Sequence, residues 1–150
     1  MEGSGIRAAT MRGTYVPNKS FRGTIAYFNG DTWDFTSTYD ADYEVATNLT
    51  LVAGTYAGLR TGNHTVTVTV DAAGTLSGHS TDGCTVAGIL SPRGKGHVFH
   101  TSVTVGGGAC RQGTETLTGV ALYDTPTNRL YCAAVNSGRT TSVLFLGTKQ

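Results

Sequence analysis

The sequence predicts an all-β fold, an antiparallel meander of about eight or nine strands that forms a closed or nearly closed β-barrel. One reason is the stretch His64 to Val70, HTVTVTV, whose strict alternation places valines on one face of a strand and threonines on the other. A second reason is composition, because the 150 residues include 21 glycines and only 14% charged residues, which suits many tight turns. A third is that the expected strands follow one another through short connections, so that neighbours in sequence can pair in space.

The start of the chain carries no recognisable element. We expect residues 1–20 to be a disordered leader or an arm added for expression, because they lack the apolar core of a signal peptide. A single β-barrel domain then spans residues 21–150, a length that can bury a sizeable core. A signal or a lipid-attachment cysteine removed for expression would leave the same sequence, so the missing signal is weak evidence for the cytoplasm.

The first expected hairpin joins residues 21–28 to residues 32–39. Its Asn-Gly-Asp turn at 29–31 is the strongest short turn signal in the chain. Trp33 and Phe35 share one face of the second strand, and polar residues stand between them. We therefore expect this aromatic face to be part of the core.

The segment 39–52, YDADYEVATNLTLV, is ambiguous. Its acidic residues would share one face of a strand, whereas Val45, Leu49 and Val52 are spaced for one side of a short helix. An aspartate at the start, such as Asp40, could cap that helix. We expect a short helical or loop segment near 40–52.

The rest of the chain alternates strands with turns. Asp71 begins a turn that ends at Gly74, where the aspartate can bond its own backbone and the glycine supplies positive φ. Together with the hairpin, these strands account for the meander. They are expected over residues 64–70, 75–78, 84–90, 97–105, 114–123, 129–135 and 140–146.

The charge of the chain argues against a nucleic-acid partner, and its hydropathy argues against a transmembrane segment. The formal net charge is +1, and lysines and arginines are scattered rather than clustered, so we expect no nucleic-acid partner. The sequence contains no run of about 18 apolar residues, so we expect no transmembrane segment.

An ordered set of short motifs covers the chain from about residue 21 to its end. It includes LVAGTYAG at 51–58, VTVDAAGTLSG at 68–78 and DGCTVAG at 82–88, with a downstream cysteine, Cys110. This set resembles a group of small, uncharacterised, secreted or lipid-anchored β-barrel domains of Gram-negative bacteria. The resemblance implies an all-β fold and a periplasmic, outer-membrane-associated or secreted location, with a possible lipid anchor in the full-length precursor. It implies no reaction.

The chain has three cysteines. Cys84 and Cys110 each lie beside a turn or a glycine-rich loop, and a disulfide between them would stabilise the fold by about 3.5 kcal/mol in the chain-entropy treatment. Free buried thiols and metal binding are the alternatives, although no CxxC or nearby histidine gives zinc spacing. Cys132 shares a strand face with Leu130 and Ala134, so we expect a small buried hydrophobic residue rather than a nucleophile.

The four histidines do not form a metal site in the sequence. His97 and His100 are three residues apart, so a strand would point them to opposite faces. His64 and His79 lie in strands that can pair, and they could come close at one end of the sheet. We expect all four at the surface or the rim.

Asp40, Asp42 and Glu44 form the densest acidic cluster. They suggest calcium binding or general acid–base chemistry. The spacing lacks the glycine and the closing bidentate acid of a calcium loop, so we expect a solvated acidic loop. No serine stands in a nucleophile elbow, and no glycine-rich stretch has the ending of a phosphate loop.

We therefore expect a non-enzymatic extracytoplasmic β-domain with a structural or protein-interaction role, without catalytic residues, cofactor or metal. The alternative is a lipocalin-like barrel that binds a small apolar or amphipathic ligand, because a barrel of this size can be filled by side chains or can hold one small molecule. The partner is thus an unknown protein or a small apolar ligand, and the oligomeric state is unknown. The aromatic residues expected mostly inside the barrel are Tyr27, Trp33, Phe35, Tyr39, Tyr43, Tyr56, Phe99, Tyr123, Tyr131 and Phe145.

Overall fold

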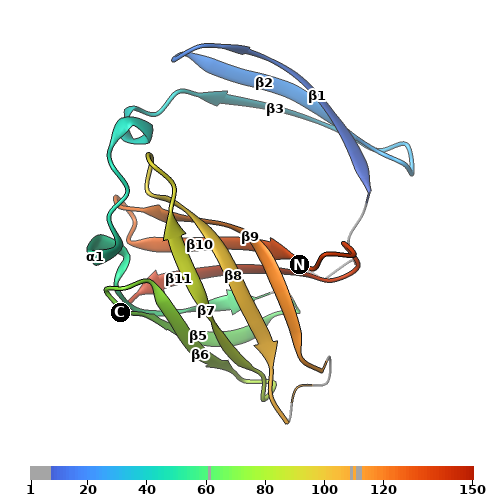
Figure 1. The fold of residues 1–150 in the computed structure, drawn as a ribbon. Helices are drawn as coiled ribbons and strands as arrows, with labels where there is room; N and C mark the ends of the chain where they lie inside the picture. The colour runs from blue at the N-terminus through green and yellow to red at the C-terminus, as the bar shows by residue number, and fades with distance from the viewer. Residues whose placement is uncertain (1–7, 61, 109, 111–112) are drawn as a thin grey trace.

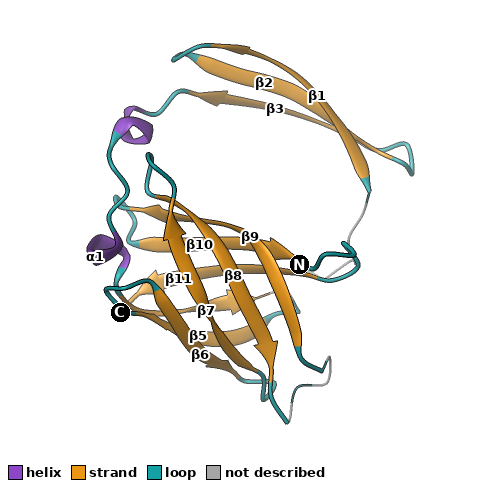
Figure 2. Ribbon diagram, in the orientation of Figure 1, coloured by secondary structure: helices purple, strands orange, loops and turns teal. Residues whose placement is uncertain are grey.

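The chain forms a closed eight-stranded barrel and a separate three-stranded antiparallel sheet (Figures 1 and 2). The computed structural model describes residues 8–60, 62–108, 110 and 113–150. The three-stranded sheet, called the arm sheet below, consists of β1 (Ala9–Val16), β2 (Ser20–Tyr27) and β3 (Thr32–Thr38). Two short helical segments follow it, the 3-10 helix η1 (Ala41–Glu44) and α1 (Leu49–Val52). The barrel consists of β4 (Gly54–Arg60), β5 (His64–Val70), β6 (Thr75–Ser80), β7 (Thr85–Pro92), β8 (Val98–Gly106), β9 (Glu115–Asp124), β10 (Arg129–Val135) and β11 (Ser142–Lys149).

The barrel is a meander, as the sequence predicted. Every barrel strand pairs antiparallel with the next, and β11 pairs with β4 to close the ring, with Phe145 opposite Arg60 and Lys149 opposite Tyr56. The short connections make this topology possible because no strand has to cross another. The strands that form the barrel are not all the predicted ones. Strand β4 was not predicted, and the predicted N-terminal hairpin lies in the arm sheet instead.

Side chains fill the interior of the barrel. Val66, Val68 and Val70 on β5 are buried, as their alternation predicted. The remaining interior cavity has a volume of about 40 Å³, far below the roughly 300–1,000 Å³ of small-molecule pockets. The predicted aromatic filling is correct for part of the set, since the aromatic residues of the core are Tyr56, Phe99, Tyr123 and Phe145.

Glycines allow the first and last barrel strands to approach closely. Gly58 on β4 lies opposite Gly147 on β11. A Cβ at Gly58 would overlap the carbonyl oxygen of Leu146, and a Cβ at Gly147 would overlap the ring of Phe145. Glycine in a strand often marks such a close approach or a bend at a barrel corner.

The arm sheet corrects two expectations. Residues 9–16 are strand β1, which pairs with β2 along its whole length, rather than part of a disordered leader. Trp33 is 70% exposed, so the aromatic face of β3 is not core. The physical reason is that this face has no second layer, and none of the described core residues comes from β1, β2 or β3.

The segment between the sheet and the barrel is helical and looped, as expected. The side chain of Asp40 caps η1 by accepting from the backbone N–H of Asp42, 3.0 Å away. Asn48 caps α1 in the same way, and Val52 at its end is fully buried. Leu49 packs against the core, whereas Val45 stays exposed. The apolar spacing therefore predicted the buried side of α1 correctly, but it was wrong for Val45 in the turn before it.

Candidate functional site

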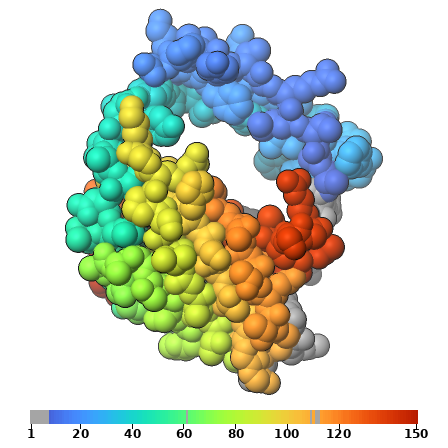
Figure 3. Space-filling view, in the orientation of Figure 1, coloured from blue at the N-terminus to red at the C-terminus, as the bar shows by residue number. Residues whose placement is uncertain are grey.

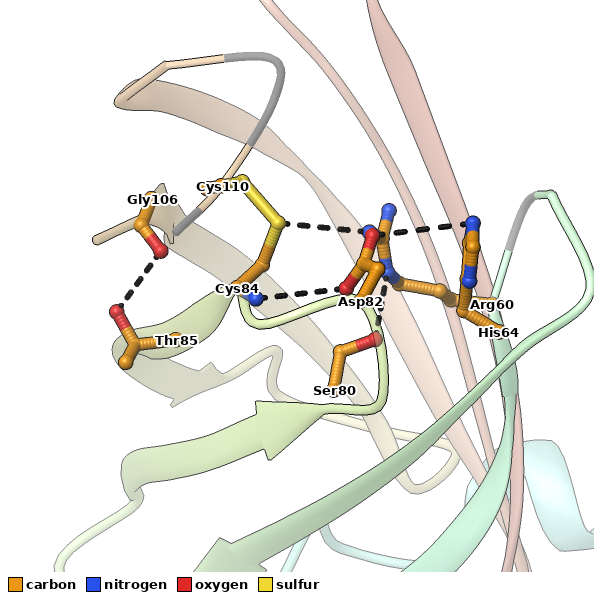
Figure 4. Close-up of polar contacts among 8 residues, drawn as sticks. All are labelled: Arg60, His64, Ser80, Asp82, Cys84, Thr85, Gly106 and Cys110. Atoms are coloured by element: carbon orange, nitrogen blue, oxygen red, sulfur yellow. Dashed lines mark hydrogen bonds and ion pairs between the residues drawn. A yellow bond between two sulfur atoms is a disulfide. The ribbon is translucent and has the colours of Figure 1, made fainter. Parts of the chain in front are cut away.

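A charged pair lies inside one end of the barrel (Figure 4). Arg60 is the last residue of β4 and points inward, with 7% of its surface exposed. Its Nη2 donates to Oδ2 of Asp82 in the turn between β6 and β7, and its Nε donates to Oγ of Ser80 at 3.2 Å. His64 lies on the solvent side, with Nε2 at 3.8 Å from the same carboxylate oxygen. These contacts give Nε and Nη2 of the guanidinium partners within the protein.

The disulfide between Cys84 and Cys110 lies beside this pair (Figure 4). The two cysteines are joined, as expected, and both are buried. Arg60 Nη2 lies 3.6 Å from Sγ of Cys84, and the backbone N–H of Cys84 donates to Oδ1 of Asp82 at 3.4 Å. One turn thus holds both the carboxylate and the first cysteine. A disulfide at this position is compatible with an oxidising, extracytoplasmic compartment.

The electrostatics of this end keep both partners charged. Burial alone would raise the pKa of Asp82, but hydrogen bonds from Ser80 and from the Cys84 N–H, together with the charge of Arg60, outweigh it and lower that pKa. Arginine side chains in proteins carry a positive charge at any physiological pH. The pair therefore joins the end of β4 to the turn between β6 and β7.

The opposite end of the barrel is closed by α1. The hydroxyl of Tyr56 donates to the carbonyl oxygen of Val52 at 2.5 Å, and its ring meets the edge of Tyr123 with 6.3 Å between centroids. Lys149 donates from Nζ to the carbonyl oxygen of Leu51 at 3.0 Å, and Nζ lies 5.6 Å from the centre of the Tyr123 ring. Helix α1, at the end of segment 39–52, is therefore held against this end of the barrel.

The predicted acidic cluster is used in local structure. Asp40 caps η1, and Glu44 accepts from the hydroxyl of Tyr39 and from Nζ of Lys95, each at 2.5 Å. The bond to Glu44 raises the pKa of Tyr39 to about 12, and the bond from Lys95 lowers the pKa of Glu44. These contacts tie the chain after the arm sheet to the turn between β7 and β8.

His97, His100 and Cys132 lie apart from one another in the fold. His97 is buried in the turn before β8, contrary to the expectation of a surface or rim position, and because it precedes the strand it does not share β8 with His100, which faces outward. Cys132 is a free, buried thiol, and burial raises its pKa to about 11. Within the part of the chain that the structure describes, no three histidine, cysteine or acidic residues gather as a metal site.

The outer wall of the barrel carries an apolar patch over four neighbouring strands. We call this the wall patch, and its members face outward on β9, β10, β11 and β4. Leu146 lies opposite Leu59 on one side and opposite Tyr131 on the other, and Tyr131 lies opposite Leu122. The leucines are 43–49% exposed. The wall patch consists of Leu59, Val120, Leu122, Tyr131, Ala133 and Leu146.

Sequence reasoning did not single out Arg60, Asp82 or the wall patch. A signal for Arg60 existed, because the alternation of Tyr56, Gly58 and Arg60 places a charge at an inward position. The wall patch needed the register of non-adjacent segments, which the sequence alone does not supply.

Comparison with known proteins adds no relative to this description. No family model, no curated protein and no solved structure matches the chain. Among the described residues, no helix is both long and apolar enough to cross a membrane. What stands is an eight-stranded antiparallel β-barrel with a disulfide.

Proposed function

We propose that this chain is a non-enzymatic, extracytoplasmic β-domain of the Gram-negative type that its motifs resemble, located in the periplasm or at the cell surface. Its role is a structural or protein-interaction role, in which the domain binds another protein. The Cys84–Cys110 disulfide supports the location, since such bonds persist in oxidising compartments.

The observation that carries the role is the uncovered apolar face of the arm sheet. Trp33 is 70% exposed, Met11 59% and Tyr15 74%, and register places all three on one face. Large aromatic residues on an exposed face are typical of protein-binding surfaces. The filled barrel then acts as a rigid support.

The interior of the barrel favours this role over ligand carriage. The cavity of about 40 Å³ is lined mostly by apolar side chains, such as Val68 and Leu90. A volume of this size has room for about two or three waters at most, so a lipid or another amphipathic molecule would have to displace core side chains.

The experiment is photo-cross-linking in the cells that produce the protein. A benzophenone amino acid replaces Trp33 in one variant and Ser77, on the polar outer wall of β6, in a matched control. We expect a protein adduct from position 33 in the extracytoplasmic fraction and none from position 77. A chain that fractionates with the cytoplasm, or that yields only small-molecule adducts, would contradict the proposal.

A further inference from the structure

We propose that two copies of this chain associate, with the arm sheet of each copy covering the wall patch of the other. This inference rests on the proposed function, because it names the partner as a second copy. Two surfaces of the same chain, the arm sheet and the wall patch, each lack a covering layer.

The arm sheet is amphipathic across all three strands. Register places Met11, Ile25 and Trp33 side by side on one face, and Tyr15 beside Phe21 further along it. The rings of Phe21 and Phe35 are 5.0 Å apart on the same face. A sheet with one apolar face has to bury that face against another element to be stable.

The opposite face of the arm sheet is mostly polar, and some of its side chains bond to one another. Thr24 donates to Oδ1 of Asp34 at 2.5 Å, and Nε of Arg22 donates to Oγ1 of Thr14 at 3.4 Å. This polar face can remain exposed to solvent. The apolar face is therefore the one that faces a partner.

The wall patch offers the complementary surface. It is apolar, continuous across β9, β10, β11 and β4, and confined to one side of the barrel. The outer faces of β5 and β6 carry hydroxyl and imidazole groups instead, including Thr69, Ser77 and His79. The apolar face of the arm sheet would therefore bind the wall patch rather than the polar outer faces of β5 and β6.

The two surfaces do not cover one another within one chain. Trp33 on the arm sheet is 70% exposed and Leu59 on the wall patch is 49% exposed. The space-filling view shows open space between the arm sheet and the barrel (Figure 3). A second copy supplies both missing layers at once, and two-fold exchange makes the contact self-complementary.

The size of the surfaces favours exchange over a single contact. Strands of 8 residues, with a rise of about 3.3 Å and a spacing of about 4.8 Å, give the arm sheet a face of about 360 Å². A standard interface buries about 800 Å² on each partner. Reciprocal exchange involves one arm face and one wall patch on each copy, about 720 Å² per partner, which approaches that size. The net charge of +1 means that two copies repel each other only weakly.

The test is sedimentation velocity of the full chain over a range of concentrations, with Trp33 fluorescence recorded on the same samples. Trp33 is the single tryptophan of the sequence and reports directly on the arm face. We expect a reversible dimer, with Trp33 emission moving to shorter wavelength as the dimer forms.

Two variants on different surfaces and one control complete the test. Leu146→Glu places a charge in the wall patch and Trp33→Ser removes the largest side chain of the arm face, so each should weaken dimerisation on the order of tenfold or more. Ser77→Glu adds the same charge on the polar wall and should leave dimerisation unchanged. Circular dichroism checks that each variant is folded.

The other outcomes overturn the inference in distinguishable ways. A dimer that neither Leu146→Glu nor Trp33→Ser weakens uses a different interface. A monomer with solvent-exposed Trp33 emission excludes self-association but leaves the proposed function to the cross-linking experiment, where the adduct would contain a different protein. A monomer with shielded Trp33 emission means that the arm sheet folds onto its own barrel, which removes the surface on which both proposals rest.

Discussion

Arg60 shows how a charge is tolerated inside an apolar barrel. Its guanidinium is held by Asp82, Ser80 and the sulfur of Cys84. A buried ion pair is a poor source of net stability, but the loss of one partner is costly because the other charge remains buried.

We predict that Asp82→Asn destabilises the protein by about 2 kcal/mol. The loss is smaller than for a fully buried pair, because the Asp82 side chain is 20% exposed. Urea unfolding measures it. The double variant Arg60→Met with Asp82→Asn is the control, and it should be more stable than Asp82→Asn alone because no unpaired charge remains. Equal stability of the single and double variants would mean that an unpaired Arg60 charge does not destabilise the protein.

The same pair predicts an acid dependence. The pKa of Asp82 is lower in the folded protein than in the unfolded chain, so its contribution to stability is fully present above about pH 4 and is lost as pH falls through the folded pKa. The difference in unfolding free energy between the wild type and Asp82→Asn should therefore shrink in acid. A difference that stays constant from pH 7 to the acid limit would contradict this assignment.

The disulfide predicts a larger effect. Replacing both Cys84 and Cys110 by serine should lower the unfolding free energy by about 3.5 kcal/mol, since the bond spans 26 residues. Chemical denaturation measures the loss. Wild-type protein treated with reductant should show a similar loss, and the double-serine variant should not respond to reductant at all.

At the scale of the element, the seam between β4 and β11 determines whether the barrel can close. Gly58 and Gly147 face each other there, and neither position has room for a Cβ. Strand pairing at the seam therefore depends on the absence of two side chains.

We predict that Gly58→Ala destabilises the barrel by about 2 kcal/mol, the usual cost of overpacking, because the new methyl group would overlap the carbonyl oxygen of Leu146. Thermal unfolding followed by circular dichroism measures it. Gly94→Ala is the matched control, since an added Cβ there meets nothing within 4 Å. An equal effect of the two substitutions would show that the seam is not tightly packed.

The elements also show what alternation can and cannot reveal. The pattern of β5 predicted a half-buried strand, and its valines are buried. The pattern around Trp33 predicted a core face by the same reasoning, and Trp33 is exposed. Alternation reports that one face is apolar, but what covers that face depends on distant segments. Strand β4 was not predicted for a related reason, because its pairing with β11 depends on residues at the far end of the chain.

At the scale of the whole molecule, the described core of the barrel is built without the arm sheet. Its core contains no described residue of β1, β2 or β3, and the segment from Tyr39 onward makes its own contacts with the turn that contains Lys95. The candidate interaction surface and the stable core are therefore carried by different strands.

We predict that a chain lacking residues 1–38 still folds as a barrel. Its melting temperature should lie within about 4 °C of that of the full chain, a change that corresponds to about 1 kcal/mol or less, and Cys84 and Cys110 should still pair. Far-ultraviolet circular dichroism and thiol alkylation measure the two properties. An unfolded truncated chain would show that the arm sheet is needed for folding.

Ring closure between the first and last strands has a consequence for synthesis. Residues 56–60 must wait for residues 145–149, the most distant pairing in the barrel, and contacts of long sequence separation form slowly. Until then a growing chain exposes two unpaired strand edges that can capture other chains. The period between the emergence of β4 and of β11 is therefore the time when a nascent chain most needs protection from misassembly.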